Sequence, residues 1–111
     1  MDKKSTLEAL AALGQETRLD VFRLLVQAGS NGMLAGEIAD ALDVRQNTLS
    51  TNLSILLSAS LIHRQRQGRG IRYFADIDGI RALLAYLMED CCGGQPELCQ
   101  PAINTIAIKA S

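Results

Sequence analysis

The chain has 111 residues, of which 48% are hydrophobic and 21% charged, and its formal net charge is −1. These values exclude a disordered chain and fit one domain, apolar enough to gain stability by oligomerising. No apolar run approaches the ~20 residues that a membrane-spanning helix needs, and the N-terminus lacks the apolar stretch of a signal peptide. We therefore expect a cytoplasmic protein.

Two helices are predicted in the first third of the chain. The first is expected from about Thr6 to Leu13, because Ser5-Thr6-Leu7-Glu8 has capping-box spacing and Gly14 follows the run. The second is expected from Glu16 to Ala28, before the breaker Gly29-Ser30-Asn31-Gly32. The residues expected to form the apolar stripes of these two helices are Leu7, Leu10, Leu13, Leu19, Phe22, Leu25 and Val26.

The middle of the chain predicts two more helices joined by a tight turn. A short helix over Gly36 to Leu42 is followed by Asp43-Val44 and by a longer helix over about Arg45 to Ser58. The apolar face of the longer helix carries Leu49, Leu53, Leu56 and Leu57, and its polar face carries Asn47, Ser50, Thr51 and Ser54. Two such helices, the second with a face of amides and hydroxyls, are typical of a helix-turn-helix.

A β-hairpin and a last helix follow. Leu61 to Arg66 and Ile71 to Ala75 alternate between faces, and the short loop between them contains two glycines. Either Asp76 or Asp78 is expected to cap a helix from Gly79 to about Cys91. The apolar side of that helix is formed by Ile80, Leu83, Leu84, Leu87 and Met88. The predicted fold is mainly α-helical with a small β-hairpin, in the order of a winged helix-turn-helix.

Positive charge is concentrated in one part of the chain. From Asp43 to Tyr73 there are five arginines and one acidic residue, so this segment carries a net charge of +4 and the remainder carries −5. Clustered arginines bind nucleic-acid phosphates and release the counterions condensed on them. The alternative, that the arginines only keep a solvated hairpin from aggregating, leaves the polar helix face unexplained. Double-stranded DNA is therefore the expected partner.

The polar helix face is expected to read bases, while the arginines bind the backbone. Gln46 and Asn47 suit pairing with adenine in the major groove, and Arg69 at the hairpin tip suits a phosphate or the minor groove. An ordinary solvated face is the alternative for the polar residues, and one hairpin arginine could instead pair with Asp76 or Asp78. The predicted DNA-binding residues are Arg45, Gln46, Asn47, Thr48, Ser50, Thr51, Arg64, Arg66, Arg69 and Arg72.

All three cysteines, Cys91, Cys92 and Cys99, lie in the last fifth of the chain. An odd number is a poor disulfide framework, and thiols in a reducing compartment more often bind metals or react. Three thiolates fit As(III) or Sb(III), whereas zinc asks for four ligands and the only histidine, His63, lies in the hairpin. Two alternatives remain: Cys91 and Cys92 continue an apolar stripe and could be packing residues, or the thiols could form a redox pair.

From about Leu7 to Cys99 the chain resembles the arsenic-responsive members of the ArsR/SmtB family of winged-helix repressors. The similar stretches are GQETRLDVFRLL, GEIADALDVRQNTLSTNLSIL and SASLIHRQRQGRGIRYFADI, the last with Ser60 where glycine is usual. The resemblance implies a homodimer, formed by the first and last helices. It also implies a repressor that binds a palindromic operator and releases it when the inducer binds.

The cysteines make the chain similar to one subgroup of that family. Leu34-Ala35-Gly36-Glu37 contains no cysteine, although many arsenic sensors carry a Cys-Val-Cys type motif there. The chain is instead similar to the subgroup with a vicinal pair and a third cysteine after the dimerisation helix. The resemblance thus implies As(III) as inducer, with Cys91, Cys92 and Cys99 as its ligands and no organic cofactor. Residues 1–92 are then the winged helix-turn-helix domain and residues 93–111 the metalloid-binding loop and tail.

Other functions stay open at this point. Within regulation, the chain could sense Sb(III), Cd(II), Pb(II) or thiol oxidation. From another class, it could be a cytoplasmic metalloid-binding chaperone that does not bind DNA. An enzyme is not expected, because the sequence has no paired-carboxylate motif, no phosphate-binding glycine loop and no nucleophile–histidine arrangement.

Overall fold

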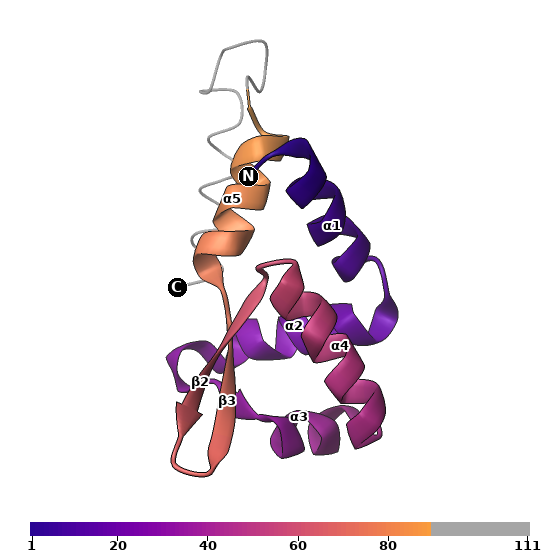
Figure 1. Cartoon of the computed structure of the whole chain (residues 1–111), viewed down its shortest axis with the longest axis vertical. Coiled ribbons are helices and arrows are strands. Elements are labelled where there is room, and N and C mark those ends of the chain that lie inside the picture. The colour runs from indigo at the N-terminus through magenta and orange to yellow at the C-terminus, as the bar shows by residue number, and fades with distance from the viewer. Residues whose placement is uncertain (90–111) are drawn as a thin grey trace.

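The computed structural model describes residues 1–89, and the predictions made for residues 90–111 lie outside the described part. The elements in chain order are α1 (Lys3–Leu13), α2 (Glu16–Ala28), the 3-10 turn η1 (Gly29–Asn31), β1 (Met33–Leu34), α3 (Ala35–Leu42), α4 (Gln46–Ser58), β2 (Ile62–Gln67), β3 (Gly70–Ala75) and α5 (Ile77–Leu87) (Figure 1). The expected fold, mainly helical with a small antiparallel sheet, is confirmed. None of the described helices has both the length and the apolar character to cross a bilayer.

Side-chain caps fix where the first helices begin. The Asp2 carboxylate accepts a hydrogen bond from the Ser5 backbone N–H at 2.7 Å, and this bond lowers the pKa of Asp2 below its ordinary value. Helix α1 therefore begins at Lys3, and the prediction that it begins at Thr6 after a Ser5 cap is wrong. Helix α2 begins at Glu16 as predicted, because Gln15 Oε1 accepts from the Arg18 N–H at 2.9 Å.

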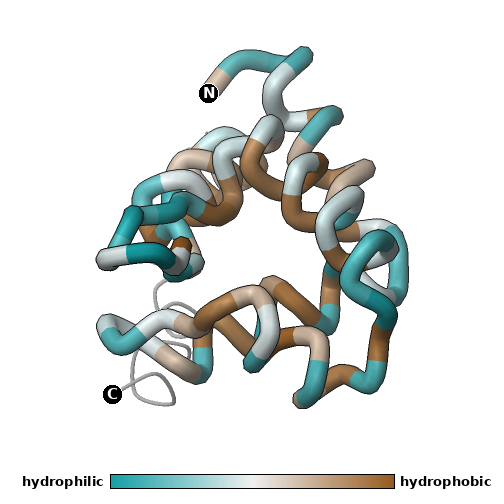
Figure 2. Tube along the Cα trace, turned by 60° about the horizontal axis from the view of Figure 1, so that its bottom comes forward, coloured by the Kyte–Doolittle hydropathy of each residue, from teal (hydrophilic) through white to brown (hydrophobic). Residues whose placement is uncertain are grey.

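The hydrophobic core lies between the helices and one side of the sheet. Hydrophobic segments recur along the trace between hydrophilic ones, as expected of amphipathic helices (Figure 2). The large side chains buried completely are Val21, Leu25, Ile38, Leu49, Leu56 and Leu61. Helices α2, α3 and α4 and the residue that precedes β2 thus share one core.

The predicted stripes of α1 and α2 are partly wrong. Helix α1 buries Thr6, Ala9 and Ala12, while Leu7 and Leu10 are exposed. Small side chains let α1 lie close to its neighbours, so the larger leucines point away from the core. Helix α2 buries Phe22 and Leu25 as predicted, together with Val21, but leaves the predicted stripe residues Leu19 and Val26 exposed.

The three strands form one antiparallel sheet in the order β1-β3-β2. The hairpin of β2 and β3, called the wing below, closes at the pair Gln67–Gly70, and Gly68 takes φ 58° in the two-residue turn. Strand β1 was not predicted, because its two residues are too few to show an alternating pattern. It pairs Met33 with Tyr73 and so ties the start of α3 to the wing.

The last helix begins earlier and ends earlier than predicted. Asp76 caps α5, since its Oδ1 accepts from the Gly79 N–H at 3.0 Å. The helix ends at Leu87, and Met88 and Glu89 form a turn. The prediction that the helix continues through these two residues toward Cys91 is therefore wrong. Only one residue of α5, Leu83, is buried in the chain.

Candidate nucleic-acid interface

Helices α3 and α4 are joined by a turn of the kind that a helix-turn-helix needs. Asp43 takes the left-handed conformation with φ 54°, and the Val44 N–H donates to the Ala39 carbonyl at 3.1 Å. Arg45 is extended and precedes α4, and its carbonyl accepts from the Leu49 N–H at 2.9 Å. The turn therefore ends α3 and starts α4 within three residues.

The first two turns of α4 present the predicted polar surface. Leu49, Leu53 and Leu56 are buried as expected, whereas Leu57 is only half-buried. The residues predicted to read DNA from this segment are all exposed: Arg45, Gln46, Asn47, Thr48, Ser50 and Thr51. An exposed helix N-terminus carrying amides and hydroxyls has the shape and hydrogen-bonding groups for a major groove.

Two of these polar side chains already make bonds within α4. Asn47 Oδ1 accepts from the Thr48 N–H at 2.9 Å. Asn47 is exposed, and its side-chain amide donates no hydrogen bond to any residue between 1 and 89. Thr51 Oγ1 donates to the Asn47 carbonyl at 3.2 Å. Asn47 can therefore donate to a base, while Thr51 can accept.

The wing carries the other predicted contacts, and three of its four arginines are exposed. Arg64 and Arg66 lie on the same face of β2, and Arg69 follows Gly68 at the tip of the hairpin. Helix α4 and the wing both lie in the lower half of the molecule in Figure 1, whereas α1 and α5 lie in the upper half. The exposed arginines and the polar face of α4 thus belong to the same end of the molecule.

Arg72 makes bonds inside the protein. Its Nη1 lies 3.7 Å from Glu37 Oε1 and donates to the Asn31 carbonyl at 3.2 Å, and its Nε donates to Gln67 Oε1 at 3.0 Å. One hairpin arginine does pair internally, but with Glu37 of α3 rather than with the predicted partners Asp76 or Asp78. Arg72 is accordingly placed to hold the wing against α3.

The sequence analysis did not identify a polar pair on the core side of α4, formed by Asn52 of α4 and the partly buried Arg18 of α2. Asn52 is 7% exposed, and its Oδ1 accepts from Arg18 Nη1 at 3.1 Å. A signal was present, because Asn52 occupies the position three after Leu49 on the apolar face. A polar residue at such a position needs a partner when buried.

The described residues offer no metal site. In residues 1–89 no three His, Cys, Asp or Glu side chains are grouped to hold a metal ion. His63 is exposed and stacks on Phe74, with ring centroids 5.1 Å apart. The predicted ligands Cys91, Cys92 and Cys99 lie outside the described residues.

The fold and this surface define a winged helix-turn-helix protein, and comparison with known proteins agrees. A family model described as "Helix-turn-helix domain" matches residues 13–65. An uncharacterized HTH-type transcriptional regulator of Bacillus subtilis is 30% identical over 93 residues, which cover 73% of this chain and 93% of the relative. The ArsR-like transcriptional regulator from Rhodococcus sp. RHA1 superimposes with a TM-score of 0.69 at 27% identity, covering 94% of this chain and 93% of the other.

A third relative is the "Putative arsenical resistance operon repressor ArsR" of Halobacterium salinarum. It is 34% identical over 76 residues, which cover 68% of this chain but only 58% of the relative. The chain belongs to the ArsR family of winged helix-turn-helix transcriptional regulators. Members of such families are regulators rather than enzymes.

Proposed function

We propose that the chain is a dimeric repressor that binds operator DNA through α4 and the wing and releases it when As(III) binds three cysteines. The observation that carries the DNA-binding part is the separation of two surfaces on one chain. Exposed polar residues and four exposed arginines lie at the start of α4 and on the wing, while α1 and α5 (Figure 1) together carry more exposed large apolar residues than the other described elements, although α2, α4 and β3 carry some as well. The first surface suits DNA, and the second suits a partner subunit.

The apolar surface, called the α1/α5 face below, supports a homodimer. Its residues are Leu7, Leu10, Leu84, Leu87 and Met88, each between 41% and 57% exposed. Large apolar side chains gathered on two adjacent helices of a soluble domain mark an interaction surface. A second copy of the chain is the proposed occupant, because a twofold dimer would bury both copies of this face and present two α4 helices to a palindromic site.

On DNA, we place α4 in the major groove of each half-site and the wing over the adjoining backbone. Gln46 and Asn47 read bases, and Thr48, Ser50 and Thr51 reach bases or phosphates. Arg45 at the start of α4 and Arg64, Arg66 and Arg69 of the wing neutralise phosphates. Arg72, which the sequence placed among these contacts, contributes by holding the wing.

As(III) is the proposed inducer because three thiolates match the three ligands that this ion takes. The support is the set Cys91, Cys92 and Cys99 in the sequence and the name of the halobacterial relative, which refers to arsenical resistance. The site needs reduced thiols, in keeping with the expected cytoplasmic location. Membership of a regulator family argues against the chaperone alternative, whereas Sb(III), Cd(II), Pb(II) and thiol oxidation are outcomes to test.

Release requires that the metalloid prefer the state that does not bind DNA. The first of the three cysteines follows the end of α5 at Leu87 by four positions, so its coordination would act on a helix of the α1/α5 face. The two α4 helices must lie about 34 Å apart to engage successive major grooves. A change in how the protomers pack therefore costs operator affinity, and emptying the operator takes a preference of several kcal/mol.

Titration of a protein–DNA complex with arsenite tests this proposal. The full chain first selects a duplex from a random-sequence library, and release is then followed by fluorescence anisotropy. Each single Cys→Ser variant should bind the selected duplex within about twofold of the unmodified chain and should not be released by arsenite. Met33→Leu in β1, which removes a sulfur but no thiol and lies outside both proposed surfaces, is the matched control and should be released normally.

Parallel titrations separate the alternatives. Antimonite, Cd(II), Pb(II) and peroxide replace arsenite, with and without reductant. Release of the Cys99→Ser variant by arsenite would contradict the three-ligand site. Release by peroxide alone would identify a thiol redox switch instead.

A further inference from the structure

One guanidinium joins α1, α2 and α4. Arg18 lies in the first turn of α2, and its Nε donates to the Ala12 carbonyl at 2.8 Å, near the end of α1. Its Nη1 donates to Asn52 Oδ1 in α4 at 3.1 Å. Asn52 Nδ2 in turn donates to the Thr48 carbonyl at 3.1 Å. The bonds thus run from the end of α1 to the segment of α4 that carries the proposed base contacts.

Each bond in this series satisfies a group that would otherwise lack a partner. The Ala12 carbonyl is one of the last four of α1, which have no partner inside the helix, and a cation is favourable at a helix C-terminus. Asn52 is buried among leucines, so an unpaired amide there would carry a desolvation cost. None of the buried side-chain nitrogen or oxygen atoms of residues 1–89 lacks a hydrogen bond.

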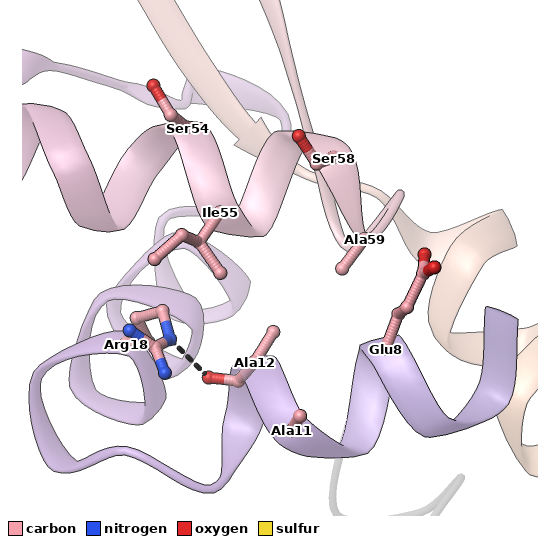
Figure 3. Close-up of a pocket in the computed structure, with 8 residues that line it drawn as sticks. All are labelled: Glu8, Ala11, Ala12, Arg18, Ser54, Ile55, Ser58 and Ala59. Atoms are coloured by element: carbon pink, nitrogen blue, oxygen red, sulfur yellow. Dashed lines mark hydrogen bonds between the residues drawn. The ribbon is translucent and has the colours of Figure 1, made fainter. Parts of the chain in front are cut away.

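Side chains do not fill all the space between α4 and α1 at this point. An open cavity of about 380 Å³ separates the two helices beside Arg18, with Ala11 and Ala12 on one wall and Ile55 and Ala59 on the other (Figure 3). Small side chains on both walls leave the gap unfilled. Within residues 1–89, the Arg18–Asn52 bond is the side-chain hydrogen bond that links α2 to α4.

We infer that Arg18 and Asn52 are positioning residues for α4: they hold the DNA-reading helix in a set orientation to α1, whose exposed leucines belong to the proposed dimer face. The inference rests on the proposed function, because it concerns how two reading helices keep their separation. Arginine suits this role, since its planar fork serves two acceptors in different directions at once. Lysine would keep the positive charge, but its single ammonium group could not donate to both acceptors in the same geometry.

The test compares Arg18→Lys with Arg23→Lys, the same change at an exposed position of the same helix. Full-length variants are titrated with the duplex selected by the unmodified chain, with a random duplex, and with selected duplexes whose half-site spacing is altered by one base pair. Arg18→Lys should lower the ratio of selected to random affinity by about tenfold, the equivalent of one or two lost hydrogen bonds. It should also flatten the dependence on spacing, while Arg23→Lys changes neither.

Asn52→Leu provides a second variant, because leucine suits the apolar face of α4 and keeps the helix packed. It should reproduce the loss of preference, and the double variant should lose little more than either single one. All variants are compared at temperatures where circular dichroism shows them folded, so that a loss of stability alone is separated from a change in reading.

Unchanged preference and spacing dependence in both Arg18→Lys and Asn52→Leu would overturn the inference. Equal losses on selected and random duplexes would overturn it too, because they would show a role in stability only. If the unmodified chain selects no duplex, the proposed function fails, and the inference fails with it.

Discussion

Ser60 occupies a backbone conformation that L-amino acids rarely adopt. Its φ is 61°, in the left-handed region, at the corner between α4 and β2. The corner is needed because α5 begins against it: a Cβ at Gly79 would overlap the Ser60 carbonyl oxygen. Glycine would fit at this position without strain, and glycine is the usual residue here in the family that the chain resembles.

Replacing Ser60 by glycine should stabilise the protein. We expect Ser60→Gly to raise the free energy of unfolding by about 1 kcal/mol, because it removes a left-handed strain of roughly that size. Thermal unfolding followed by circular dichroism should show a higher Tm. The matched control is Ser54→Gly on the exposed side of α4, which should lower stability by about 0.5 kcal/mol. A fall in Tm for both variants would show that Ser60 is not strained.

The elements of this chain differ in how far their sequence predicts them. Helix α2 and the wing are within a residue or so of the prediction, since periodicity and glycine-containing turns are local signals. The exposed face of α4 was predicted as well, because its polar residues recur at helical spacing. Strand β1 and the Arg72–Glu37 pair were not predicted, because each depends on residues that are distant in sequence.

The apolar faces of α1 and α5 show why pattern alone misleads. Leu10 and Leu84 recur at helical spacing and were expected to line an apolar side, yet they are exposed. A hydrophobic stripe indicates that a helix face is covered, but it does not indicate whether the same chain or a second chain covers it. Likewise Asn52 could not be assigned a partner from sequence, since Arg18 lies 34 residues away.

The wing contains two arginines with different expected roles, which can be separated by experiment. Arg69→Ala should weaken binding to every duplex alike and reduce the magnitude of the slope of log K against log salt by about 1.8, because one phosphate contact is lost in each protomer of the dimer. Arg72→Ala should leave the salt slope unchanged and lower stability by about 1 kcal/mol, because its bonds to Glu37 and the 31–32 backbone are lost.

Fluorescence anisotropy at four or more salt concentrations gives the slopes, and urea unfolding gives the stabilities. Both variants lose one positive charge, so each is the other's control for net charge. A reduced salt slope for Arg72→Ala, with stability unchanged, would show that Arg72 contacts DNA after all.

At the scale of the whole molecule, the net charge is near zero although the two ends of the molecule differ in their surface residues. The end formed by α4 and the wing (Figure 1) carries four exposed arginines, Arg45, Arg64, Arg66 and Arg69, and the end formed by α1 and α5 carries four exposed leucines, Leu7, Leu10, Leu84 and Leu87. Because a twofold dimer uses the same face of both copies, joining the α1/α5 faces would leave both DNA-reading ends free. Dimerisation and DNA binding can therefore occur at the same time, because they use different surfaces.

Leu84→Glu should therefore separate the dimer and, as a result, halve the electrostatic footprint on DNA. The substitution occurs twice in a twofold interface, and burial of one leucine contributes about 1.5–3 kcal/mol, so the dimer dissociation constant should rise more than 100-fold. Sedimentation equilibrium measures this rise. A monomer contacts one half-site only, so its salt slope on the selected duplex should be about half that of the unmodified chain. Ile71→Glu, at an apolar position of the wing that is 37% exposed against 48% for Leu84, should leave the dimer intact. If Leu84→Glu dimerises like the unmodified chain, the α1/α5 face is not the interface.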